Sequence, residues 1–112
     1  MLRVLALPWR LFEAPDVTTR AFASVAPGPD GVLLTIRVVA PDSQRVEVAG
    51  SFSGWEPLPL RRTADGWEAQ VTLGSGRHRV AVRIDGGVWK APSNLGAVRD
   101  EFGGSAGLVV VP

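Results

Sequence analysis

Hydrophobic and polar residues alternate with a period of two along much of the chain after Gly31. In Val32–Ala40, the residues Leu34, Ile36 and Val38 fall on one side of an extended strand, and the polar residues between them fall on the other. Three later segments show the same alternation: Val46–Ala49, Trp67–Leu73 and Arg77–Ile84. Such runs are typical of strands with one face buried and one face in water.

Turn residues punctuate these runs. Proline, glycine, aspartate or serine marks each boundary, at Pro41–Gln44, Ala64–Gly66, Gly74–Gly76 and Asp85–Gly87. Shorter strands are expected at Leu60–Thr63, Val88–Lys90 and Leu108–Val111, with a long loop at Ala91–Gly104, and no stretch has a convincing helical pattern. The pattern therefore predicts an all-β sandwich of about seven strands.

The first part of the chain is less regular. Residues 1–29 are expected to form an extension with one or two strands, at Leu2–Leu7 and Val17–Val25, followed by the sandwich domain at residues 30–112. Apolar side chains are too frequent at residues 2–12 to be left in water, so they either dock on the domain or contact a partner protein or a second copy. This apolar run is a poor signal peptide and too short to cross a membrane, so a cytoplasmic protein without membrane contact is expected.

Composition narrows the function. The chain has 112 residues, 46% of them hydrophobic, and a net charge of +1, which fits one globular domain and gives no field that favours nucleic acid. It has no cysteine and one histidine, His78. No metal site, cofactor motif or nucleophile–base pair is evident, so we expect a protein that is not an enzyme and needs no cofactor.

The order of several motifs carries a family resemblance. They are the turn "GSFSGW" ending at Trp55, the "DGW" strand start at Trp67, the "GRHRVAVRIDGG" hairpin, the Trp89 that follows it, and "FGG" at Phe102. This arrangement, over Gly31–Val111, resembles the carbohydrate-binding modules of family 48. That family includes the isoamylase early-set domains and the glycogen-binding domain of the AMP-activated kinase β subunit. The resemblance implies an immunoglobulin-like sandwich that binds α-1,4-glucan such as glycogen, without catalysis.

The resemblance also suggests site residues. Trp55 and Trp89 match the two stacking tryptophans, and Phe102 matches the apolar residue that supports the sugar. Indole rings suit this role because the C–H faces of sugars pack on aromatic planes. The binding lysine and asparagine of the family fall on Ala81 and Gly107 here. Four other side chains are candidate hydrogen-bonding partners for sugar hydroxyls: Arg79, Arg83, Lys90 and Asn94.

Alternatives stay open from the sequence. Both indoles could be buried, and the sandwich could be an interaction or regulatory domain that has lost sugar binding. Trp67 and His78 are expected to face inward, Asp85 to cap its own turn, and Asp100 and Glu101 to be solvated loop charges. The carbohydrate interpretation requires that Trp55 and Trp89 lie side by side on the outside of the sandwich.

Overall fold

The computed structural model describes residues 20–99 and 104–112. Their elements, in chain order, are β1 (Arg20–Gly28), β2 (Gly31–Val39), β3 (Val46–Gly50), the 3₁₀ turn η2 (Ser51–Ser53), β4 (Leu58–Pro59), β5 (Arg61–Thr63), β6 (Gly66–Leu73), β7 (Gly76–Ile84), β8 (Ala97–Arg99) and β9 (Ser105–Val111). Within these residues no helix is long and apolar enough to cross a membrane.

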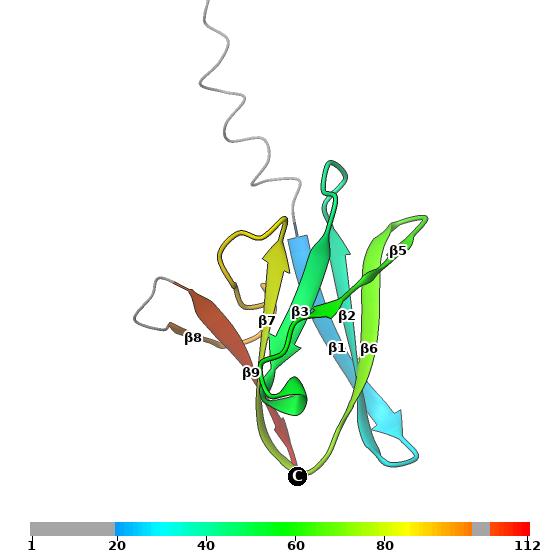
Figure 1. The fold of residues 1–112 in the computed structure, drawn as a ribbon. Helices are drawn as coiled ribbons and strands as arrows, with labels where there is room; N and C mark the ends of the chain where they lie inside the picture. Colours follow the sequence, from blue (N-terminus) through cyan, green and yellow to red (C-terminus); the bar gives the residue numbers. More distant parts are fainter. Residues whose placement is uncertain (1–19, 100–103) are drawn as a thin grey trace, which may run out of the picture.

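The strands form two antiparallel sheets, which face each other as layers in Figure 1. One sheet has the order β1-β2-β6-β5 and the other has the order β4-β3-β7-β9-β8. This arrangement confirms the all-β, immunoglobulin-like sandwich. The described residues contain nine strands rather than about seven, because β4 and β8 arise in segments expected to be connections. The expected strand at Val88–Lys90 reduces to one bridge, between Val82 and Lys90.

The alternating residues form the core between the sheets. Leu34, Ile36 and Val38 of β2 are buried, as their spacing predicts. They meet inward-facing valines from β3 and β7, which belong to the same hydrophobic cluster. Because successive side chains of a strand point to opposite faces, the residues between these valines lie on the outer face of the second sheet.

β1 is an integral strand of the first sheet. It pairs with β2 along its whole length, from Arg20 opposite Val39 to Gly28 opposite Gly31. Residues 26–31 thus form the end of a hairpin, and part of the expected strand Val17–Val25 is β1. The expected strand at Leu2–Leu7 lies outside the described residues.

Candidate functional site

The outer face of β7 carries the candidate arginines. Val80 and Val82 are buried in the core, so Arg79, Ala81 and Arg83 point to the other side of the sheet. The pairing register places Ala81 opposite Ala49 of β3. The expectation that Arg79 and Arg83 flank Ala81 on one strand face is therefore confirmed. Ala81 lies between the two arginines along the strand, but it and Ala49 are buried and offer no surface to solvent.

Trp89 lies at the Arg83 end of this face. Lys90 and Val82 form reciprocal backbone hydrogen bonds, with N···O distances of 2.8 and 2.9 Å, which fix the segment beside β7. Lys90 shares the inner face with Val82, so its neighbour Trp89 falls on the outer face. There the guanidinium carbon of Arg83 lies 4.4 Å from the centroid of the half-buried Trp89 ring. The two side chains form a cation–π pair.

Glu47 of β3 also holds the guanidinium of Arg83, in addition to the contact with Trp89. It lies directly across the β3–β7 pair from Arg83. Arg83 donates from Nε to Oε1 of Glu47 at 3.0 Å, and its Nη2 forms an ion pair with the same oxygen at 2.9 Å. The Glu47 side chain is only 16% exposed, so solvent screens this ion pair less than a pair on an open surface. Arg83 is thus fixed between a carboxylate and an indole.

Trp55 lies at the end of the turn that follows β3. Gly50 begins the turn where β3 and β7 approach closely, and a Cβ added to Gly50 would meet the carbonyl oxygen of Arg79 and the ring of Phe52. Gly54 and Trp55 then adopt left-handed conformations, with φ of 62° and 65°. This conformation is rare for a bulky residue and costs about 1–3 kcal/mol. The Trp55 side chain nonetheless stays 47% exposed.

The two indoles lie near opposite ends of the segment of β7 that runs from Arg79 to Arg83. The Trp55 turn is attached to β7 at Arg79, whose N–H donates to Ser51 Oγ at 2.9 Å, whereas Trp89 lies beside Arg83. At about 3.3 Å per residue, these attachment points are about 13 Å apart along β7. Neither ring is in the hydrophobic core.

Two other predicted binding residues are placed elsewhere. Lys90 lines a groove on the inner side of β7, on the opposite face from Trp89. The Asn94 side chain is engaged with β1: it accepts from the Ala23 N–H at 2.9 Å and donates to the Ala23 carbonyl at 2.6 Å. Their roles in sugar binding stay untested, but the structure does not bring either to the outer face. Phe102 lies outside the described residues, as do Asp100 and Glu101.

The position matched to the family's asparagine also faces inward. Gly107 pairs with buried Val80, and a Cβ added to it would lie 2.7 Å from Leu95 Cδ1. The adjacent Ala106 is on the outer side of β9, opposite Val98 of β8. A polar side chain would therefore reach the outer face from position 106 rather than 107, and alanine stands there.

Three further expectations concern residues outside this face. Trp67 is buried in the core, as expected. His78 bonds through Nε2 to the Gly74 carbonyl at 2.8 Å, and its buried Nδ1 has no partner within the described residues. Asp85 does not cap its own turn: its Oδ1 accepts from the backbone N–H groups of Gln44 and Arg45, at 2.9 and 2.8 Å. The prediction for Asp85 was wrong because a turn distant in sequence supplies better-placed donors.

Glu47 is the residue of this face that the sequence analysis missed. Its signal is its place as the polar residue between buried Val46 and Val48, which puts it on the outer face. Its partner depends on the β3–β7 register, which a single sequence does not give. In the part of the chain that the structure describes, no group of three or more His, Cys, Asp or Glu side chains is placed to hold a metal ion.

Comparison with known proteins bears on this arrangement. The family model described as the glycogen recognition site of AMP-activated protein kinase matches residues 37–112. The matched region includes the strands and turns that carry Trp55, Arg79, Arg83 and Trp89. No curated protein shows a significant match to the chain.

Proposed function

Because this chain belongs to the family of glycogen recognition sites of AMP-activated protein kinase, we propose that it binds an α-1,4-glucan of the glycogen or starch type. Binding takes place on the outer face of the β4-β3-β7-β9-β8 sheet, and the chain acts as a binding module without catalytic activity. The observation that carries this proposal is the gathering of Trp89, Arg83 and Arg79 on this face, with exposed Trp55 at its end.

In the proposed complex the indoles supply the contact area. Trp55 is open to solvent and its ring packs on the C–H face of one glucose unit. Trp89 has Arg83 over one face of its ring, so a second glucose packs against the part of the indole that Arg83 leaves uncovered. Ala49 and Ala81 lie opposite each other between the two rings but are only 0% and 1% exposed, so the sugar chain contacts the larger side chains around them.

The arginines supply the polar contacts. Arg79 is exposed, and no ion pair involves its side chain within the described residues, so its guanidinium is available to sugar hydroxyls. Arg83 is already fixed by Glu47 and offers its remaining N–H donors in a defined direction. These two guanidinium groups replace the contact that the family's lysine makes from the position occupied here by Ala81.

Affinity electrophoresis in a gel containing glycogen tests the proposal. The wild type is expected to migrate more slowly than in a plain gel, and Trp55→Ala combined with Trp89→Ala is expected to remove this retardation. Phe22→Ala is a matched control, because Phe22 is an aromatic residue of similar exposure, 41%, on β1 of the other sheet. The proposal fails if the wild type is not retarded, or if the control variant loses as much retardation as the double variant.

A second candidate is an interaction domain that has kept the fold without sugar binding. The observation that favours it is the absence of polar side chains at Ala81 and at both Ala106 and Gly107. Under this alternative the wild type shows no retardation by glycogen, starch or pullulan, although circular dichroism and thermal unfolding show a folded protein.

A further inference from the structure

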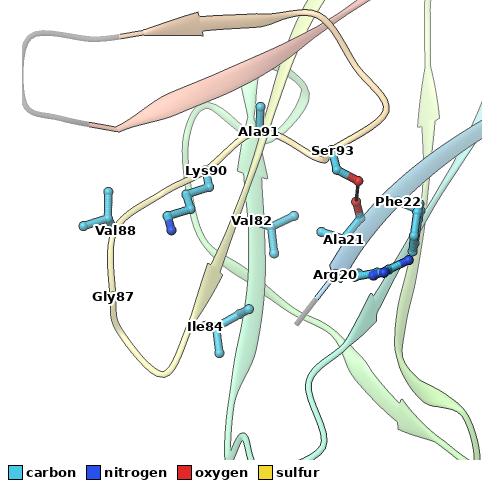
Figure 2. A pocket seen from close by; sticks show the side chains of 10 residues that line it. All are labelled: Arg20, Ala21, Phe22, Val82, Ile84, Gly87, Val88, Lys90, Ala91 and Ser93. Atoms are coloured by element: carbon cyan, nitrogen blue, oxygen red, sulfur yellow. Dashed lines mark hydrogen bonds between the residues drawn. The ribbon is translucent and has the colours of Figure 1, made fainter. Parts of the chain in front are cut away.

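A groove opens between the two sheets on the side away from the proposed glucan face. Its volume is about 720 Å³, and its lining is mostly apolar. Val82 and Ile84 of β7 lie between Ala21 of β1 on one side and the segment carrying Val88 and Lys90 on the other, as Figure 2 shows. Core residues of the sandwich therefore reach solvent along this groove.

One end of the groove is closed by the chain itself. Ser93 donates to the Ala21 carbonyl from its backbone N–H at 2.9 Å and from Oγ at 3.0 Å, which joins the loop after Lys90 to β1. The lining also includes Arg20, the first residue that the structure describes. The chain that precedes β1 therefore connects directly to the groove.

We propose that the apolar segment Leu2–Phe12 of this same chain docks in the groove. Seven of its eleven residues are large and apolar: Leu2, Val4, Leu5, Leu7, Trp9, Leu11 and Phe12. Burial of some of these side chains against Val82, Ile84 and Val88 removes apolar surface of both partners from water. The groove is as large as the pockets that hold drug-sized ligands, so it takes several side chains and not the whole segment.

The connection between segment and groove fits this occupant. Residues 13–19 join Phe12 to Arg20 and include Pro15–Asp16, a pair that favours a turn and would reverse the chain direction. The same connection carries Glu13 and Asp16. Arg20 and Lys90 contribute positive charge at the groove, and no ion pair involves either of them within residues 20–99 and 104–112. The acidic residues of the connection and the basic residues of the groove thus favour docking by this chain's own N-terminal segment.

Engineered disulfides test this placement, because the chain has no cysteine of its own. A cysteine at Leu7, Trp9 or Leu11 is combined in turn with Val88→Cys in the groove, or with Val110→Cys on the outer side of β9. Val88 and Val110 are 55% and 61% exposed, so both substitutions should be tolerated. At low protein concentration, at least one pairing with Val88→Cys should form an intramolecular disulfide at least ten-fold faster than its Val110→Cys counterpart.

Protection from trypsin gives an independent measurement on cysteine-free protein. Docking should slow cleavage after Arg10, and Val88→Asp should accelerate this cleavage several-fold, whereas Val110→Asp should not. The proposal is overturned if no pairing favours Val88, if the cross-links join two chains, or if Arg10 is cleaved equally fast in the wild type and Val88→Asp. Cross-links between chains would show a second copy in the groove instead.

Discussion

Arg83 lies over the Trp89 ring, with its guanidinium carbon 4.4 Å from the ring centroid, and the two residues come from neighbouring extended segments of one sheet. The position of the indole therefore depends on the position of the guanidinium. Glu47 fixes that guanidinium through one hydrogen bond from Nε and an ion-pair contact with Nη2, both to one carboxylate oxygen. A residue that need not touch sugar thus sets the geometry of the proposed glucan face.

Glu47→Gln should therefore weaken glycogen binding without unfolding the protein. The amide keeps the size of the side chain but removes its charge, so Arg83 is held less firmly and its contact with Trp89 loosens. We expect glucan affinity to fall roughly two- to five-fold, which corresponds to about 0.5–1 kcal/mol. Isothermal titration with a maltooligosaccharide measures this change.

Glu68→Gln is the matched control for Glu47→Gln. Glu68 pairs with Arg37 at 3.9 Å on the other sheet, and its side chain is 20% exposed, close to the 16% of Glu47. Glu68→Gln should leave the affinity for the maltooligosaccharide unchanged. Equal losses of affinity in the two variants would show that Glu47 acts through general charge or stability rather than by positioning Arg83.

Two substitutions of Trp55 should both remove glycogen binding but should differ in their effect on the free energy of unfolding. Its φ of 65° suits glycine better than any other residue, so Trp55→Gly relieves backbone strain that Trp55→Ala retains. We expect both variants to lose retardation by glycogen, and Trp55→Gly to have a free energy of unfolding about 1 kcal/mol above that of Trp55→Ala. Urea denaturation followed by circular dichroism measures the difference. A Trp55→Gly protein that still binds glycogen like the wild type would remove Trp55 from the site.

Asn94 should behave as a structural residue of the β1 edge. Asn94→Ala removes both hydrogen bonds to Ala23, and we expect it to lower the free energy of unfolding by about 1–3 kcal/mol. Ser93→Ala should cost less, because the Ser93 backbone N–H still donates to the Ala21 carbonyl. Hydrogen exchange at the Ala23 amide should accelerate in Asn94→Ala alone. Lost glycogen retardation with unchanged stability would instead support the sugar contact predicted from the sequence.

The parts of the fold that a local pattern determines could be predicted from the sequence. The alternation in β2 identified Leu34, Ile36 and Val38 as core, and the alternation in β7 placed Arg79 and Arg83 on one outer face. These results need only the period of a strand and no knowledge of its neighbours.

Features that depend on the pairing of distant segments could not be predicted from the sequence. Trp89 and Lys90 are adjacent in sequence and both were predicted to bind sugar, but the Val82–Lys90 bridge puts them on opposite faces. The pairing of Glu47 with Arg83 depends on the β3–β7 register in the same way. The amide of Asn94 is used by β1, a strand more than seventy residues earlier in the chain.

Asp85 joins two turns that are distant in sequence, and this contact should stabilise the fold. Its Oδ1 accepts from the N–H groups of Gln44 and Arg45, and its own N–H donates to the Arg45 carbonyl at 2.8 Å. Asp85→Ala leaves the two donors without their carboxylate, so we expect the free energy of unfolding to fall by about 1–3 kcal/mol. Asp85→Asn keeps an acceptor oxygen and should retain part of that stability. Thermal unfolding of both variants measures the effect.

Asp42→Ala is the control for Asp85→Ala, because Asp42 lies in the turn that Asp85 holds and its carboxylate has no hydrogen bond or ion pair within the described residues. It should change stability by less than about 0.5 kcal/mol. Since β3 begins directly after Arg45 and carries Glu47, loss of the Asp85 contact should also increase hydrogen exchange at the start of β3. Equal effects of Asp42→Ala and Asp85→Ala would show that the turn responds to lost charge and not to the two hydrogen bonds.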